Sequence, residues 1–420
     1  MSKQSVSRLS RRQFVQTAAV AAAATSAFPH FARAADADLP IKVGLIGAGG
    51  RGTGAAHNVL AAAKGVQVVA VADIAKDRLE NAKKDLRGKN QDIKDEHCFL
   101  GMDAYKKLLA LDNVNYVILA TPPYYRPEHL EASIKAGKHV FTEKPVAVDP
   151  VGIRRFIAAG KDAAAKKLSI VAGTQRRHQA GYVETIKRIH DGALGKIVAG
   201  QCYWNMGMLW YNKKAQGWSD MEWMHRDWVN WTWLSGDHIV EQHVHNLDVI
   251  NWALKILPTK AVAMGSRHRR VTGDQYDNFS VDFFYPGDKE HPEIHVLSQC
   301  RQINGCANDV SERVIGTKGI SNCNGWISNV GKIESQGKDP YVQEHTDLIA
   351  AIRQGEPINE AEQVAHSTMC AIMARMSAYT GKAVTWSDAM KSDLQLAPPE
   401  GPLTPEYVKS LIAVPGDEEK

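Results

Sequence analysis

Cysteine is scarce in this chain of 420 residues, and its six cysteines are scattered, with no CxxC pair and no spacing typical of a metal site. We therefore expect them to be buried apolar residues. The sequence also lacks an internal repeat and, beyond its N-terminal leader, a long low-complexity segment. These absences favour an ordinary globular protein over a repeat protein or a cysteine-based metal domain.

Beyond its N-terminal segment, the chain also has little net charge. The formal net charge is +5, but the five basic residues before residue 35 (Lys3, Arg8, Arg11, Arg12 and Arg33) have no acidic residue among them. The rest of the chain is close to neutral, so no electrostatic argument favours binding to nucleic acid or to an anionic membrane. A composition with 44% hydrophobic and 23% charged residues fits two soluble globular domains at this length.

The first 34 residues have the pattern of a targeting segment. The string SRRQFV at residues 10–15 resembles a twin-arginine export signal, an alanine-rich apolar stretch follows at 17–28, and Ala32-Arg33-Ala34 fits a cleavage site. The apolar stretch is too short to be a stable membrane anchor. We expect residues 1–34 to be a signal peptide that directs the folded protein, with any cofactor already loaded, to the periplasm or otherwise out of the cytoplasm.

Residues 41–73 carry the most informative motif of the chain. A short apolar run at 41–46 is followed by G-x-G-x-x-G (Gly47, Gly49 and Gly52), a helical stretch, a second apolar run and Asp73, which lies 21 residues beyond Gly52. The glycines allow a tight turn and a close approach of the backbone to a pyrophosphate, and the acid suits the ribose hydroxyls. An acid at this place repels a 2′-phosphate, so the pattern predicts NAD in preference to NADP.

Strand and helix patterns alternate up to about residue 174, which predicts an α/β fold with an N-terminal Rossmann domain, a doubly wound parallel sheet, at residues 40–174. From residue 175 strand-like segments follow one another. They predict a C-terminal α+β domain at 175–395 with a large open, mainly antiparallel sheet, for substrate binding and oligomerisation. Residues 396–420 are expected to be a C-terminal tail.

Several short motifs resemble those of the Gfo/Idh/MocA oxidoreductases, the glucose-fructose oxidoreductase and inositol dehydrogenase family. They are TPP at 121–123, His129, AGKHV at 136–140 and EKP at 143–145, in the family's order and spacing. The resemblance implies the two-domain fold predicted above and a homodimer or homotetramer built through the open sheet. With the glycine fingerprint, it implies that NAD is contacted by Gly47, Gly49, Gly50, Arg51, Gly52, Asp73, Thr121, Pro122, His129, Glu143 and Lys144.

Lys144 is the first candidate catalytic residue, because a lysine at a strand end can hydrogen-bond a substrate hydroxyl and assist its proton transfer. The second candidate group is Glu241, His245 and Asp248, whose spacing would place them on one face of a helix. The family has D-x-G-x-H-x-x-D here, so Glu241 replaces the first Asp and His243 replaces the Gly. His245 suits acid/base work and Glu241 can support it, whereas His243 fits a packing role as well as a functional one. A metal held by His238, Glu241 and His245 is an alternative that we do not favour.

Seven of the ten tryptophans lie between residues 204 and 233. Aromatic faces mixed with polar groups suit sugar rings, and they equally suit a core or a subunit interface. The expected substrate contacts are Arg176, Trp204, Trp231, His243 and Asp248.

The sequence thus predicts an exported NAD-dependent oxidoreductase that transfers hydride between a sugar, polyol or sugar derivative and a tightly held nicotinamide. One alternative is an NAD-dependent glycosidase that works by transient C3 oxidation and elimination. Another is a sugar-binding protein without chemistry.

Overall fold

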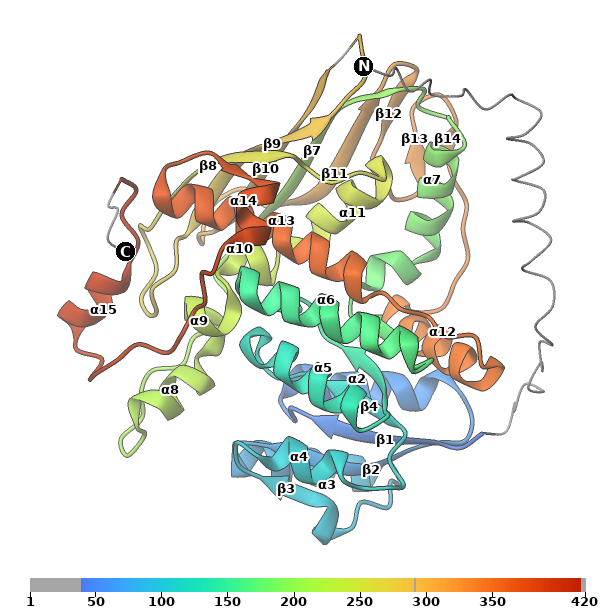
Figure 1. Cartoon of the computed structure of the whole chain (residues 1–420), viewed down its shortest axis with the longest axis vertical. Helices are drawn as coiled ribbons and strands as arrows, with labels where there is room; N and C mark the ends of the chain where they lie inside the picture. Colours follow the sequence, from blue (N-terminus) through green and yellow to red (C-terminus); the bar gives the residue numbers. More distant parts are fainter. Residues whose placement is uncertain (1–38, 291, 417–420) are drawn as a thin grey trace, which may run out of the picture.

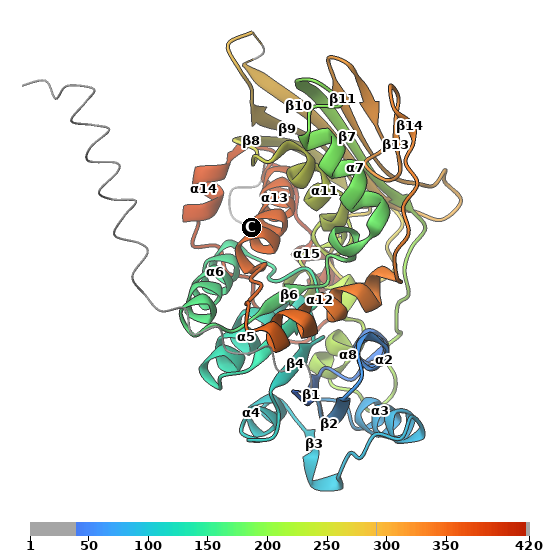
Figure 2. The same ribbon diagram turned by 90° about the vertical axis from the view of Figure 1, so that its right-hand side faces the viewer.

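The structure is a computed structural model that describes residues 39–416 except residue 291. The predicted signal peptide at 1–34 lies outside these residues. The described chain forms two domains, with the N-terminal sheet at one end of the molecule and a larger sheet at the other (Figure 1). Helices α6 (Pro150–Ala165) and α13 (Ala361–Thr380) lie between the two sheets, as both views show (Figure 2).

The N-terminal sheet has six parallel strands in the order β3-β2-β1-β4-β5-β6, which confirms the predicted Rossmann fold. The strands are almost wholly apolar and buried, as expected where helices cover both faces of a sheet. They are β1 (Ile41–Ile46), β2 (Val66–Asp73), β3 (Cys98–Leu100), β4 (Tyr116–Leu119), β5 (His139–Thr142) and β6 (Ile170–Ala172). The other helices of this part are α2 (Gly50–Ala62), α3 (Lys76–Gly88), α4 (Ala104–Leu109) and α5 (Arg126–Lys135).

The second sheet has nine strands and is antiparallel except where β7 (Ile197–Met206) pairs with β10 (Glu293–Gln302), as the sequence analysis expected. Its other strands are β8 (Lys260–Ser266), β9 (Asn278–Pro286), β11 (Asp309–Gly316), β12 (Gly319–Ser321), β13 (Trp326–Ile327), β14 (Gly331–Lys332) and β15 (Val384–Thr385). The helices of this region are α7 (Ala180–His190), α8 (Asp220–Arg226), α9 (Thr232–Ser235), α10 (His238–Glu241), α11 (Val244–Leu254), α12 (Pro340–Gln354), α14 (Trp386–Lys391) and α15 (Pro405–Leu411). The short 3₁₀ turns are η1 (Asp95–His97), η2 (Pro123–Tyr125), η3 (Gln175–His178) and η4 (Trp228–Asn230).

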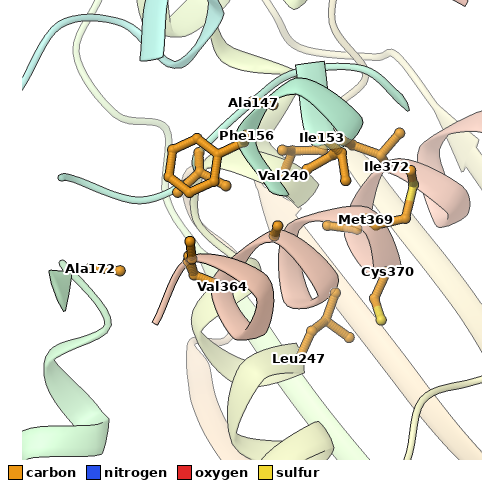
Figure 3. Close-up of a cluster of buried hydrophobic side chains, with 14 of the residues drawn as sticks. Ala147, Ile153, Phe156, Ala172, Val240, Leu247, Val364, Met369, Cys370 and Ile372 are labelled. Carbon is orange, nitrogen blue, oxygen red and sulfur yellow. The ribbon is translucent and has the colours of Figure 1, made fainter. Parts of the chain in front are cut away.

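Helix α13 joins the domains through its apolar surface. Met369, Ile372 and their neighbours on α13 meet Phe156 of α6 on one side and Leu247 of α11 on the other, all of them buried (Figure 3). Burial of each large apolar side chain contributes about 1.5–3 kcal/mol, so this layer is a substantial part of the stability. The same layer fixes α10 and α11 relative to the first domain.

The domain boundaries are less simple than the sequence suggested. Helix α12 returns to the first domain, where Leu348 and Ile349 share a core with α2 and the strands of the first sheet. Asn359 also bridges to Ile170 of β6. Along the chain the strands of the first sheet end with β6, before residue 174. In the folded protein, however, α12 also packs in the first domain.

The predicted tail likewise packs on the fold. Leu396, Leu403 and α15 cover a core of Met224, Trp231, Trp233 and Leu234. Within residues 39–416, apart from 291, no helix has the length and apolar character needed to cross a membrane.

His178 of η3 contacts acidic side chains on α12 and just before α13. Its Nδ1 lies 2.6 Å from the carboxylate of Asp347 on α12, and its Nε2 lies 3.4 Å from the carboxylate of Glu360. Burial disfavours the imidazolium, but the two carboxylates outweigh burial and raise the pKa of His178 to about 10. A folded-state pKa above the unfolded value of 6.5 means that the folded state holds this proton more tightly.

We predict that His178→Gln destabilises the protein by roughly 2–4 kcal/mol near pH 6 and by progressively less as the pH rises toward 10. The charged contact is fully present below the unfolded pKa and is lost as His178 deprotonates in the folded state. Thermal unfolding of both proteins at about pH 6, 8 and 10 measures this difference. A difference that stays constant or grows with pH would contradict it.

Candidate functional site

The glycine turn after β1 has the geometry of a dinucleotide-binding loop. Gly47 has φ +94°, and a Cβ there would lie 2.7 Å from the backbone of Thr121. A Cβ on Gly52 would lie 1.8 Å from the carbonyl oxygen of Gly47, so this glycine lets α2 pack on the turn. A Cβ on Gly49 would meet only the Arg78 guanidinium, at 3.9 Å. Two glycines thus shape the turn, and the middle one leaves room for a ligand beside the start of α2.

A cavity of about 900 Å³ opens at this turn. Its walls include the glycine turn, Asp73 at the end of β2, and Thr121, Pro122 and His129. The Asp73 carboxylate accepts hydrogen bonds from the backbone N–H of Ala48 and Ala75 at 2.7 and 2.8 Å. The residues that the fingerprint and the TPP motif predicted are therefore brought together. A dinucleotide fits the chemistry of this wall, with backbone amides for its phosphates and a carboxylate for its ribose hydroxyls.

His129 is buried at the cavity wall, and its Nδ1 lies 3.1 Å from the hydroxyl of Thr121. Burial, together with the charge of Arg126, lowers the pKa of His129 to about 3. The ring is consequently neutral at physiological pH and holds Thr121 in place.

Arg51 and Glu143, both predicted to contact the cofactor, contact each other. The Arg51 guanidinium forms an ion pair with Glu143, lies 3.3 Å from the carboxylate of Glu344 on α12, and stacks over the ring of Tyr341. Glu344 is buried, and burial together with nearby Glu143 raises its pKa well above the usual value. This group couples the glycine turn to the end of β5 and to α12.

Lys144 projects from the end of β5 toward the second domain. The bond from Lys144 to Pro145 is cis. The Nζ donates hydrogen bonds to the backbone oxygen of Glu241 at 2.7 Å and to its Oε1 at 3.2 Å. The two side chains are only 13% and 10% exposed, so one charged group from each domain is largely shielded from solvent.

His245 lies next to this pair at the start of α11. It is 7% exposed, and its ring stacks on Trp204 of β7 with centroids 5.6 Å apart. Burial, with the charges of Lys144 and Arg176, lowers the pKa of His245 well below 6.5. A neutral imidazole at this position can accept a proton.

The expectation of one helix through Glu241, His245 and Asp248 was wrong. Helix α10 ends at Glu241 and α11 begins at Val244, so the chain breaks between them. His238 is buried with its Nδ1 2.9 Å from Asp237. Over the residues that the structure describes, no group of three or more His, Cys, Asp and Glu side chains could hold a metal ion.

Three predicted substrate contacts occupy packing positions instead. His243 is fully buried, its Nε2 lies 2.6 Å from the hydroxyl of Ser298, and burial lowers its pKa to about 3. Asp248 is buried and accepts two hydrogen bonds from Arg177, at 2.7 and 2.9 Å. Trp231 is 0% exposed in the core under α15. The structure thus places His243, Asp248 and Trp231 among other parts of the protein, and their contact with a substrate stays a prediction.

Arg176 and Trp204 lie beside His245. The Arg176 guanidinium pairs with Glu312 of β11 and stacks over the ring of Trp204 at 5.5 Å. The Trp204 indole N–H donates to the side chain of Gln242 at 2.8 Å. These side chains surround His245 with aromatic and hydrogen-bonding groups.

Sequence reasoning missed several residues of the site. Glu344 and Glu312 belong to no motif, and they reach Arg51 and Arg176 from segments more than 100 residues away. Trp210 and Trp228 line the dinucleotide cavity, which the tryptophan clustering did not indicate. The clustering was a sound signal for function, but it did not separate the cofactor wall from the core.

Comparison with known proteins gives a family for the N-terminal part. Residues 41–170 match the family model GFO_IDH_MocA, described as "Oxidoreductase family, NAD-binding Rossmann fold". The chain is 28% identical over 235 residues to inositol 2-dehydrogenase 4 of Saccharopolyspora erythraea, covering 56% of this chain and 59% of that protein. It is 29% identical over 160 residues to a glycosyl hydrolase family 109 protein of Streptomyces coelicolor, covering 38% of this chain and 33% of that protein.

A solved structure supports the fold of most of the chain. Scyllo-inositol dehydrogenase from Lactobacillus casei, with bound NAD(H) and scyllo-inositol, matches with a TM-score of 0.61 at 19% identity, over 82% of this chain and 99% of that one. The curated relatives named above are matched over less than two thirds of their own length. The comparisons confirm the NAD-binding domain and the two-domain fold.

We predict opposite outcomes for two glycine variants. Gly49→Ala leaves the melting temperature of the nucleotide-free protein unchanged and weakens NAD binding on the order of tenfold or more, because its methyl group enters the space of the pyrophosphate. Gly52→Ala lowers that melting temperature by about 3 °C or more, because its Cβ collides with backbone.

Thermal unfolding and calorimetric titration of NAD into the nucleotide-free proteins check both variants. Unchanged NAD affinity in Gly49→Ala would disprove the assigned position of the pyrophosphate.

Proposed function

We propose that the protein is an NAD-dependent oxidoreductase acting on the CH–OH group of a sugar, polyol or sugar derivative. The match of residues 41–170 to an oxidoreductase family with an NAD-binding Rossmann fold supports this proposal. The observation that carries the proposal is the meeting of Lys144, from the end of β5, with Glu241 and His245 of the second domain. In a parallel sheet of this kind, ligands bind at the carboxyl ends of the strands, where Lys144 stands.

Each of the three side chains has a distinct task. Lys144 carries donors that can hold the oxygen of a substrate hydroxyl and stabilise the negative charge that develops on it. His245, kept neutral by its surroundings, accepts the hydroxyl proton as the C–O bond becomes a carbonyl. Glu241 holds the Lys144 ammonium in position.

NAD, when bound, supplies the acceptor for the hydride that leaves the same carbon. Asp73 at the cavity wall favours NAD over NADP, because its carboxylate repels a 2′-phosphate.

The side chains that surround His245 support the proposed substrate class. Trp204 offers an aromatic face, while Arg176 and Gln242 offer hydrogen-bonding groups beside it. A sugar or cyclic polyol presents apolar C–H faces and a hydroxylated rim, which suits such walls. The similarity to a protein named inositol 2-dehydrogenase supports the same class.

The protein is proposed to work outside the cytoplasm, after export by the twin-arginine route. The support is the leader at residues 1–34 with Arg11 and Arg12. Outside the cytoplasm no soluble nicotinamide pool restores the cofactor, so hydride must pass on to a second substrate or return to the first.

Return of hydride to the same sugar gives the second candidate function, a redox-neutral glycosidase. The observation that favours it is the similarity to a protein named glycosyl hydrolase family 109. Oxidation of the C3 hydroxyl to a ketone acidifies the C2 proton, whose removal expels the C1 substituent. Addition of water and reduction of the ketone then restore the sugar.

A homodimer or homotetramer through the open face of the nine-stranded sheet is part of the proposal. Val262 and Leu297 flank Asp282 in register on that face, and both are exposed at 44% and 37%. Light scattering of the purified protein measures the mass, and a monomer would exclude this assembly.

We predict that Lys144→Met lowers turnover on the order of a thousandfold while NAD stays bound, because the glycine turn and Asp73 are intact. The measurement uses protein purified with its own cofactor and a panel of free sugars, polyols and chromogenic glycosides. Reduced-nicotinamide absorbance and leaving-group release are followed together.

Lys196→Met is the matched control, since Lys196 is an exposed lysine paired with Asp288 and Glu290 in the second domain. If a free sugar reduces the bound nicotinamide and the nicotinamide stays reduced, the result supports the oxidoreductase. If the leaving group of a glycoside is released repeatedly while the nicotinamide does not stay reduced, the result supports the glycosidase. Sugar binding without nicotinamide reduction or leaving-group release would contradict the proposal. Near-normal turnover in Lys144→Met would contradict it as well.

We predict that replacing Arg11 and Arg12 together by lysine retains the protein in the cytoplasm of a host with a twin-arginine system. Cell fractionation with antibody detection compares the variant with the unchanged leader. Equal export of the two would argue against this route.

A further inference from the structure

The chain between β7 and α9, residues 207–231, leaves the second domain and reaches the first; we name it the aromatic segment. Its helix α8 lies beside the N-terminal domain, away from the nine-stranded sheet (Figure 1). Three of its side chains, Trp210, His225 and Trp228, line the dinucleotide cavity together with Asp73 and Arg78. The glycine turn therefore forms one wall of the cavity, and the aromatic segment forms another.

Two polar contacts fasten the aromatic segment to the N-terminal domain. Arg226 of α8 donates hydrogen bonds to both carboxylate oxygens of Asp77, at 3.0 and 3.1 Å. Asp77 stands in the first turn of α3, four residues beyond Asp73. The Tyr125 hydroxyl of the N-terminal domain and the His225 Nε2 of α8 are 2.7 Å apart.

The same segment is anchored more firmly on its other side. The buried carboxylate of Asp227 accepts a hydrogen bond from the Thr272 hydroxyl at 3.0 Å. The Asp220 carboxylate accepts from the backbone N–H of Leu403, next to α15, at 3.0 Å. By contrast, the Asp77 side chain is 57% exposed. The Asp77–Arg226 pair is thus the more exposed of these polar contacts, and it is the one that a substitution can remove without disturbing the base of the segment.

We propose that the aromatic segment is a clasp for the cofactor: Trp210 and Trp228 are dinucleotide-binding residues on the adenosine side, and the Asp77–Arg226 pair sets how fast the nucleotide leaves. The adenosine side is indicated because Arg226 of the same segment contacts Asp77, which lies four residues beyond Asp73, the predicted ribose ligand. Planar indole rings suit a purine base, which presents a π-face whatever its edge contacts. The inference rests on the proposed function through NAD binding and export, and it makes no use of the redox step.

A clasp of this kind matches the needs of an exported protein. A nucleotide that is loaded before export is lost by dilution outside the cytoplasm unless it leaves slowly. The ordinary fingerprint contacts are shared with domains that exchange NAD freely, so slow release needs an additional barrier. The aromatic segment supplies this barrier from the second domain.

The test measures nucleotide release directly. Protein loaded with radiolabelled NAD is mixed with excess unlabelled NAD, and the label that remains bound is counted over time. Asp77→Asn and Arg226→Gln each speed release about two- to fivefold, as expected for an exposed ion pair, and the double variant is no faster than the faster single variant. Trp210→Ala, a change at a side chain that is 44% exposed, speeds release about tenfold or more.

Arg188→Gln is the matched control, because Arg188 forms an exposed pair with Glu184 on α7. Release from this variant stays at the wild-type rate. Release at the wild-type rate from both Asp77→Asn and Trp210→Ala overturns the clasp. The release experiment requires no turnover. If the protein has no redox activity but the variants release NAD faster than the wild type, the result supports the clasp and contradicts only the proposed function.

Discussion

The contact between Lys144 and Glu241 is the constraint on which the reaction centre depends, because it fixes the end of β5 against the end of α10. Two nearly buried charges lose most of their hydration, and their mutual attraction at 3.2 Å offsets that cost only while both remain in place. The separation of the domains, the charge of Lys144 and the position of His245 are therefore linked. Burial, together with the ammonium beside it, lowers the pKa of His245 and keeps the imidazole neutral.

The contact between Lys144 and Glu241 is supported by helices from a chain that passes between the domains more than once. Helix α12 packs in the core of the N-terminal domain, while α13 fills the layer between α6 and α11. The buried group of Arg51, Glu143 and Glu344 then connects this packing to the glycine turn. A change in the way the domains meet would alter the cofactor turn and the reaction centre together, because the same helices support both.

The tryptophan-rich stretch shows how one residue type serves different purposes within thirty positions. Trp204 stacks on His245 at the reaction centre, Trp210 and Trp228 face the dinucleotide cavity, and Trp231 is in the core. The proposed retention of the cofactor by this stretch fits the proposal that hydride passes to a second substrate or returns to the first. A cofactor that remains bound is useful only when each cycle restores it.

By itself, the sequence determined the parts of the protein that depend on local pattern. The glycine spacing, Asp73 and the EKP string predicted the turn, the cofactor and Lys144, because tight turns and strand ends are set by neighbouring residues. The alternation of strands and helices predicted both sheets. Only the tertiary structure decided that α10 and α11 are separate, that His243, Asp248 and Trp231 are packed away, and that Glu344 reaches Arg51. Those outcomes depend on which distant segments become neighbours, and that is set by the joint burial of apolar surface and the pairing of charges across the whole chain.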